Sequence, residues 1–398
     1  MKRILAVGLL MAFACGHRVV LAQNSTATAV AVDELSEPTR VTLRIDNLHA
    51  VDGVGRLAKA AGLELSDVPP DVADALRGKT VTASFEAEPL LPALKELCRQ
   101  AKIEPLILRL PDGRATLSLR IPRPTPMDVA FARGPAPPNS LCPSASVGPV
   151  LVTLVAASTS ASWVPKASEQ PRGRVSFDFI VLAEPKLDLV AMMPLAQADA
   201  VKDEHAGPMP VSDRGMPGYN DTSGEQQAFS IHLSLPDREV HKVSLLQATL
   251  RARIAKRRES LSVPAVLDGP ERAGPVERAL AGVRLRIEPL VKRGDEFELT
   301  YTLSRDTMPT AMWQSLTSDP SARGPQLVDQ DGLPLFQRAN REPHRANNEI
   351  TVVRRLGRTS TVADQSKRGE PTRMVWSVPV ETEEIEIPFE FRDLPVPR

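Results

Sequence analysis

Aromatic residues are scarce in this sequence, and so are cysteines and long apolar runs. Only 4% of the 398 residues are Phe, Trp or Tyr, and 49 basic residues balance 49 acidic ones. Without a basic excess the chain has little to neutralise a phosphate backbone, so we expect no nucleic-acid partner. No segment after the first 22 residues holds about 18 uninterrupted apolar residues, so no transmembrane helix is predicted.

The first residues have the three parts of a secretory signal. Lys2 and Arg3 are followed by the apolar run Ile4–Ala14, and Val20-Leu21-Ala22 offers small residues for cleavage. We predict a signal peptide over residues 1–22, cleaved near Ala22. Cleavage would remove three of the 49 basic residues and no acid, which leaves a net charge of −3. The expected location is periplasmic or secreted, in association with the envelope.

The three cysteines leave two questions open. Cys15 lies in the signal, where it could carry a lipid anchor, and this is the one route by which we expect the chain to touch a membrane. An oxidising compartment would permit a disulfide between Cys98 and Cys142. The alternative is that Cys98, on the apolar stripe of a predicted helix, is a free core residue.

Proline is abundant, with 37 residues, and it divides the chain. Residues 23–38 are small and polar and are predicted to form a flexible leader. Eight prolines fall between 122 and 149, which is typical of an extended, semi-rigid linker. The linker separates a compact segment, residues 39–121, from a longer one, residues 150–398.

The compact segment alternates between strand and helix patterns. Apolar residues at Val41, Leu43 and Ile45 and at Val81, Ala83 and Phe85 recur with the period of a half-buried strand. Helical apolar stripes follow each strand, over 52–61 and 89–101, and a hairpin turns at Pro111-Asp112-Gly113. Two strand–helix–strand units predict a small α+β domain.

This segment resembles the short N-terminal domain shared by secretins and TonB-dependent receptors. The resemblance rests on the opening strand, on Ala61-Gly62-Leu63, on Gly78-Lys79 before Val81, and on the helix with Leu94, Leu97 and Cys98. It covers about a fifth of the chain. In that family the domain is a periplasmic interaction module without catalysis. The membrane β-barrel that usually follows it is not recognisable here, which leaves a channel or transport role in doubt.

Residues 150–398 are predicted to be almost entirely strands, each with one buried and one solvent-exposed face. They predict an antiparallel β-sandwich region of one or two domains. Two stretches, 184–226 and 318–348, look like long surface excursions, and 310–316 like a helix. Gly294-Asp295 is predicted to turn between strands at 283–287 and 297–303. Pro388 indicates a sheet edge or bulge.

The sequence indicates no catalytic, cofactor or metal site. The histidines are scattered, and no nucleophile motif or phosphate-binding loop occurs. Asp329 and Asp331-Gly332 resemble the start of a calcium loop, but the remaining ligand positions are missing. A hairpin turn explains them better. Glu383, Glu384 and Glu386 flank an alternating strand, which favours a solvated strand face over a glycosidase pair.

Two surfaces are candidates for binding. The first is a strand edge in the compact segment, which could pair with a partner strand. Its framing residues are Val41, Leu43, Ile45, Val81 and Phe85. The second is a basic patch, which could grip an anionic polymer or protect a strand edge from aggregation. It consists of Arg251, Arg253, Lys256, Arg257 and Arg258.

We therefore expect an exported, non-enzymatic envelope protein with a scaffold or binding role toward an envelope protein or polymer. Two alternatives stay open. One is a hydrolase of envelope polymer whose site lies in the loops of the β-rich region. The other is a surface or cell-wall protein that associates with itself.

Overall fold

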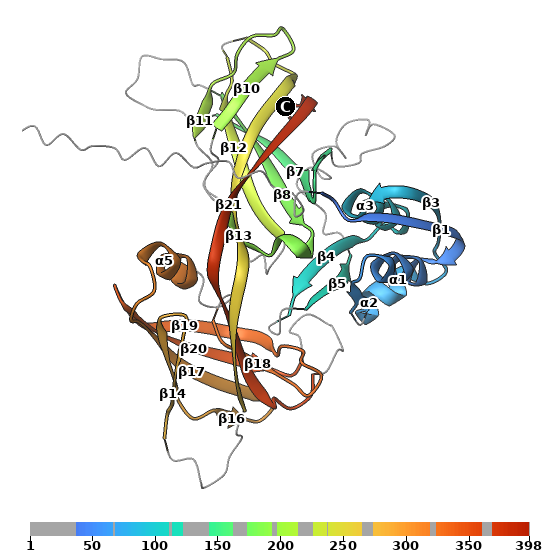
Figure 1. The fold of residues 1–398 in the computed structure, drawn as a ribbon. Coiled ribbons are helices and arrows are strands. Elements are labelled where there is room, and N and C mark those ends of the chain that lie inside the picture. The colour runs from blue at the N-terminus through green and yellow to red at the C-terminus, as the bar shows by residue number, and fades with distance from the viewer. Residues whose placement is uncertain are drawn as a thin grey trace, which may run out of the picture. The chain divides into compact units, whose positions relative to one another are not determined.

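A computed structural model of the chain describes most residues from 37 onward (Figure 1). The described ranges are 37–66, 68–110, 114–121, 143–161, 173–192, 197–213, 226–236, 238–264, 274–318, 324–359 and 368–397. They are mostly β, with few helices and several antiparallel sheets, which confirms the expected β-rich character. No helix among them has the length and apolar character needed to cross a membrane.

The first part of the described chain alternates strands and helices as the sequence predicts. Its elements are β1 (Arg40–His49), α1 (Ala50–Ala60), β2 (Glu64–Leu65), α2 (Pro70–Leu76), β3 (Thr80–Pro89), α3 (Leu90–Ala101), β4 (Glu104–Arg109) and β5 (Ala115–Arg120). β1 and β3 form an antiparallel pair, and β2, β5 and β4 form a three-stranded sheet in that order. The turn predicted at Pro111-Asp112-Gly113 lies outside the described residues.

These elements share one apolar core. The stripes of α1 and α3 supply Val54, Leu57, Leu94 and Leu97, all at most 1% exposed. Cys98 lies in the same core as a free thiol, and burial, with a further effect of the Glu104 charge, raises its pKa. The core reading of Cys98 therefore fits its position, whereas Cys142 lies outside the described residues.

The second part begins with two sheets. Its elements are β6 (Ser144–Val147), β7 (Val150–Ala161), β8 (Gly173–Ala183), the 3₁₀ turn η1 (Pro185–Leu187), β9 (Leu189–Met192), β10 (Gln197–Asp203), β11 (Val211–Asp213), β12 (Gln226–Ser234) and β13 (Lys242–Pro264). One sheet has the order β11-β12-β8-β7-β6. The other contains β10 and β13, with β9 paired to β13.

The last part forms another antiparallel sheet and adds two strands to the sheet that contains β10 and β13. Its elements are β14 (Val276–Leu280), β15 (Val283–Ile287), β16 (Val291–Arg293), β17 (Glu296–Arg305), α5 (Thr310–Ser318), β18 (Gln326–Val328), β19 (Phe336–Ala346), β20 (Glu349–Gly357) and β21 (Arg373–Pro395). The order β14-β15-β17-β20-β19, with β16 paired to β17, makes the sheet that we call the third sheet, counted from β6 onward. β21 returns to pair with β13, and β18 pairs with the start of β21.

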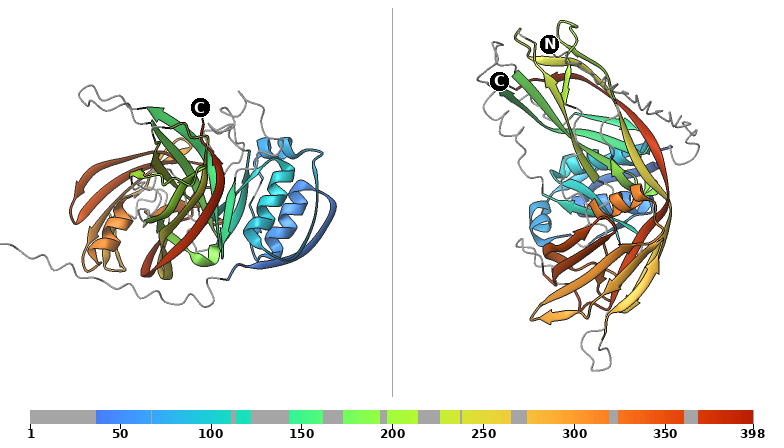
Figure 2. Two further views of the ribbon diagram at one scale, coloured as in Figure 1. Left: turned by 90° about the horizontal axis from the view of Figure 1, so that it is seen from above. Right: turned by 90° about the vertical axis from the view of Figure 1, so that its left-hand side faces the viewer.

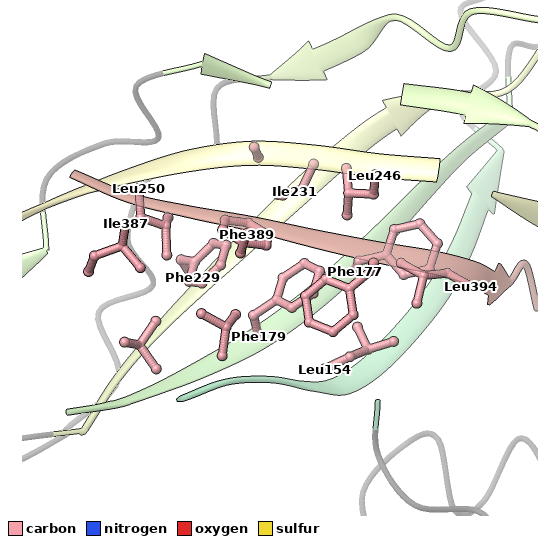
Figure 3. Close-up of a cluster of buried hydrophobic side chains, with 14 of the residues drawn as sticks. Leu154, Phe177, Phe179, Phe229, Ile231, Leu246, Leu250, Ile387, Phe389 and Leu394 are labelled. Carbon is pink, nitrogen blue, oxygen red and sulfur yellow. The ribbon is translucent and has the colours of Figure 1, made fainter. Parts of the chain in front are cut away.

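Two separate cores hold these strands. Between the two five-stranded sheets, Phe179 stacks on Phe229 at 5.0 Å between ring centroids, and Phe389 meets both rings (Figure 3). The third sheet and α5 bury a different cluster that includes Tyr301 and Trp376. β13 and β21 contribute to both clusters, because they run paired from Lys242–Pro395 to Pro264–Arg373 (Figure 2).

Several predicted boundaries were wrong. The linker predicted over 122–149 already contains β6. The predicted excursion 184–226 contains three strands, with Leu187, Val201 and Met209 buried. The one predicted over 318–348 contains all of β18 and β19. Short strands among Gly and Pro carry too few alternating residues to stand out from loops. The sequence reading also missed α2, whose Pro70 is tolerated in a first helical turn.

Other local predictions were confirmed. The helix expected at 310–316 is α5, and β15 pairs with β17 as expected. The Gly294-Asp295 turn, however, joins β17 to β16 rather than to β15. Pro388 faces β13 through Thr249 and has no strand opposite on its other side among the described strands, so it lies at a sheet edge.

Candidate functional site

The predicted strand edge belongs to the β1–β3 pair, and its named side chains point into the protein. Val41, Ile45 and Val81 are at most 1% exposed, and Leu43 and Phe85 are half-buried cross-strand partners. These five residues fix the sheet on its core. What β1 can offer a partner strand is therefore its backbone.

At Thr82, the outer edge of β3 is occupied by a side chain of α3. Gln100 accepts a hydrogen bond from the Thr82 N–H at 3.1 Å and donates one to the Thr82 carbonyl at 3.1 Å. A carboxamide that bonds both backbone groups of one residue replaces a neighbouring strand at that point. The Thr82 contacts also show that Thr82 directs its backbone groups away from β1.

The register then identifies the free groups of β1. Backbone groups alternate sides along a strand, so Ala83 and Phe85 point toward β1, and their partners Ile45 and Leu43 point toward β3. Arg44 lies between those partners, and its N–H and carbonyl must point to the opposite edge. No described strand pairs with that edge.

Some of the other sheet edges are blunted by proline. β4 contains Pro105, β19 contains Pro343, and β21 contains Pro379 and Pro388. Proline cannot donate to a ladder, and natural sheets use it to prevent edge pairing. β1 has no proline, although bulges follow Val41 and Ile45 and shorten its regular part.

The five residues of the predicted basic patch each have an acidic partner. The pairs are Arg251 with Glu386 at 3.3 Å, Arg253 with Glu384 at 2.7 Å, Lys256 with Glu383 at 2.5 Å, Arg257 with Glu381 at 3.9 Å, and Arg258 with Asp188 at 2.7 Å. β13 supplies the cations, and β21 supplies four of the five carboxylates. This ladder of opposite charges greatly weakens the positive field that would attract an anionic polymer.

A small polar cluster lies across β8 and β12. Asp178 accepts hydrogen bonds from Ser230 at 2.6 Å and from Ser176 at 3.4 Å. His232 is the cross-strand partner of Ser176, but its ring makes no hydrogen bond within the described part of the chain. A serine, an acid and a histidine thus share one strand face without forming a relay. The sequence pattern did not single out Asp178.

Asp329 holds a turn together. Its Oδ1 accepts the N–H groups of Asp331 and Leu333, and its Oδ2 accepts that of Gly369 at 3.0 Å. The bond from the Asp329 N–H to the Leu333 carbonyl closes the predicted hairpin turn. Within the described ranges, no three His, Cys, Asp or Glu side chains are grouped to hold a metal ion.

Sequence reasoning missed the partners that give these surfaces their character. Gln100 carries no motif, and Glu381–Glu386 lie over a hundred residues from the cations that they pair with. Only the strand register brings these groups together. The predicted cleavage site at Ala22 and the candidate lipid anchor Cys15 lie outside the described residues.

Comparison with known proteins adds little. No protein-family model and no curated protein matches the chain. The crystal structure of a conserved domain protein from Bacillus anthracis is 10% identical, covers 63% of this chain and 90% of its own, and has a TM-score of 0.18. A TM-score this low carries no argument about fold or function.

Proposed function

We propose that this chain is an exported, envelope-associated binding protein without catalytic activity, and that it takes up a partner strand at the free edge of β1. The observation that carries the proposal is the contrast between the two edges of one sheet. Gln100 occupies the edge of β3 at Thr82, whereas no described strand pairs with the edge of β1 to which the Arg44 backbone groups point. An edge of this kind binds an extended peptide through main-chain hydrogen bonds.

The proposal includes the architecture and the location. Residues 39–121 would form an α+β module related to the short N-terminal domain of secretins and TonB-dependent receptors. The alternation of strands and helices from β1 to β5 supports this relation. The core shared by the two five-stranded sheets supports a β-sandwich. A signal peptide ending near Ala22 would export the chain to the periplasm or the cell surface.

Strand addition favours a protein partner over an envelope polymer, because a polysaccharide lacks the alternating amides that a strand edge pairs with. The ion-pair ladder on β13 and β21 points the same way, since it leaves the predicted basic patch mostly neutralised.

The test is a proline at Arg44. Arg44→Pro removes one N–H from the free edge and leaves the bonds of Leu43 and Ile45 to β3 in place. Arg44→Ala is the matched control, because it removes the side chain and its ion pair with Asp46 but keeps the N–H. Partners are captured from the protein's own envelope by each variant, and circular dichroism checks that each is folded.

We expect Arg44→Ala to retain the partner and Arg44→Pro to lose it. In the complex, the Arg44 amide should exchange its hydrogen more slowly than in the free protein. If folded Arg44→Pro retains every partner of the wild type, the β1 edge is not the binding site. Retention of envelope polymer alone would point to the polymer reading instead.

The second candidate is a hydrolase of envelope polymer, favoured by the Asp178, Ser230 and His232 cluster. Incubation of the protein with purified envelope polymer measures this hydrolytic activity. Release of soluble fragments by the wild type and loss of release in Ser230→Ala would replace the binding proposal. The third reading, a self-associating structural protein, predicts concentration-dependent sedimentation of the purified chain.

A further inference from the structure

Two arginines near the start of β19 and β21 bury part of their guanidinium groups without an acceptor. The Nε atoms of Arg338 and Arg368 are shielded from solvent and have no hydrogen-bond partner. Arg338 donates from Nη2 to the Thr359 hydroxyl at 2.8 Å. Arg368 lies over the Phe336 ring at 4.8 Å from its centroid. A buried donor without an acceptor is costly, so each such atom needs an explanation.

The two guanidinium groups flank the same point of the third sheet. Phe336 of β19 and Gly357 of β20 are direct cross-strand partners, so their side-chain directions lie on one face. Arg368 covers Phe336 on that face. A Cβ at Gly357 would lie 2.5 Å from the Arg338 Nε, so the Arg338 guanidinium occupies the place of the missing side chain.

Local backbone geometry holds Arg338 there. The β19–β20 register shifts between Gln337 and Ala339, which makes Arg338 the extra residue of a bulge. Bulges redirect a side chain and are frequent beside functional sites. Gly357 is the second requirement, because any larger residue would displace the guanidinium. Two independent features of the backbone, the bulge and Gly357, thus position the Arg338 side chain.

The neighbouring acids are committed to other groups. Glu370 accepts the Arg358 guanidinium at 2.8 Å and faces the Lys292 ammonium at 3.3 Å. Asp329 directs its oxygens to backbone N–H groups. Among the residues that the structure describes, no carboxylate forms an ion pair with Arg338 or Arg368. Neither guanidinium charge is therefore balanced by a described carboxylate, and each would attract an anion placed beside it.

We propose that Arg338 and Arg368 bind an oxyanion, either free or as a group on a larger ligand, at the Phe336–Gly357 pair of the third sheet. The guanidinium fork suits phosphate, sulfate and carboxylate groups, and the Thr359 hydroxyl lies beside it to add a donor. Arg358, whose Nε donates to the Arg368 carbonyl at 3.0 Å, fixes the backbone of the site. This site does not depend on the β1 edge.

Calorimetry on the full chain tests the site with sodium phosphate, sodium sulfate and sodium acetate. Sodium chloride at equal ionic strength is the reference. Polyphosphate distinguishes a phosphate group on a polymer from the free ion. The variants are Arg338→Gln, Arg368→Gln and the conservative Arg338→Lys. Arg341→Gln is the matched control, because Arg341 is an exposed arginine of the same strand.

We expect saturable binding of at least one oxyanion, and a loss of about tenfold or more in affinity for each glutamine variant. Arg338→Lys should lose part of the affinity, because lysine keeps the charge without the fork. Arg341→Gln should bind like the wild type. Circular dichroism shows which variants are folded, and Arg338→Lys serves if Arg338→Gln is not.

Two results would overturn the proposal. One is heat that does not saturate with any oxyanion beyond the chloride reference. The other is an equal loss of affinity in Arg341→Gln, which would indicate general charge screening. Tighter binding of polyphosphate than of phosphate, abolished in Arg368→Gln, would identify a polymer-borne group as the ligand.

Discussion

β13 and β21 pair with each other along their whole length, but the two ends of the pair are buried and its middle is solvated. One end is buried between the two five-stranded sheets, where Leu250 and Phe389 are at most 5% exposed. The other end is buried against the third sheet through Trp376. Between them, the register from Ala255 to Arg258 shifts twice and the side chains are charged.

This contrast teaches that pairing alone does not tell how much a strand stabilises the fold. The buried ends exclude water from apolar surface, which is the dominant favourable term in folding. In the middle, ion pairs in solvent satisfy charges but add little free energy. The middle of the pair therefore connects two cores that are stabilised separately. It also gives a reason why the sequence could not say whether residues 150–398 are one domain or two.

The largest effect should come from the buried end. Phe389→Ala removes a ring that lies 6.0 Å from Phe179 and 5.9 Å from Phe229. We expect a loss of about 3–5 kcal/mol in the free energy of unfolding, measured by urea denaturation. Glu386→Ala, an exposed change on the same strand, should cost less than about 1 kcal/mol. Similar losses in both variants would remove the distinction between buried and solvated positions.

A buried acid at the end of β10 should give the next effect. Asp203 is 0% exposed, bonds Arg238, and accepts the N–H groups of His205 and Gly207 at 2.8 and 2.9 Å. Burial raises the pKa of Asp203, but the Arg238 and backbone hydrogen bonds outweigh it and hold the pKa below its usual value. The stabilisation is thus full above the ordinary aspartate pKa and is lost as the pH falls through the lowered one.

Asp203→Asn should therefore cost about 1–3 kcal/mol at pH 7, and the difference from the wild type should shrink toward pH 2. Urea unfolding at several pH values measures it. A difference that stays constant with pH would mean that Asp203 acts through shape and not through charge.

Alternating apolar residues made the longer strands predictable. β1, β3, β8, β12 and β17 all follow the period of two, because each buries one face. The middle of β13 lost that period at Lys256-Arg257-Arg258, so the sequence suggested a basic patch there that could grip an anionic polymer or protect a strand edge. The strand continues, because β21 brings a matching run of glutamates.

The candidate sites were less predictable for a physical reason. Arg44 lies at a free backbone edge because the β1–β3 register turns its N–H and carbonyl away from β3, where no described strand follows. Arg338 and Arg368 are thirty residues apart, and only a bulge, Gly357 and the Phe336 ring place them at the same cross-strand pair. Such sites depend on which strands pair and where a bulge shifts the register, and the alternation within a single strand does not specify either.

The smallest effects distinguish two ion pairs of β13. Arg258 binds Asp188 through two hydrogen bonds of 2.7 and 2.9 Å, and their side chains are 24% and 15% exposed. Arg251 and Glu386 are 50% and 60% exposed at 3.3 Å. A double-mutant cycle with glutamine and asparagine substitutions should give about 0.2–1 kcal/mol for the exposed pair and roughly twice that for the bidentate pair.

Asp188 also contacts Arg109 at 3.2 Å, so the cycle is needed to isolate the Arg258 contribution. Raising the salt concentration from 0.1 to 1 M shortens the screening length from about 10 to about 3 Å. It should therefore remove most of the coupling in the exposed pair and less of that in the Arg258 pair. If both coupling energies fall equally with salt, the Arg258–Asp188 pair is as exposed to solvent as the Arg251–Glu386 pair. No ion pair in the middle of β13 would then be protected by burial.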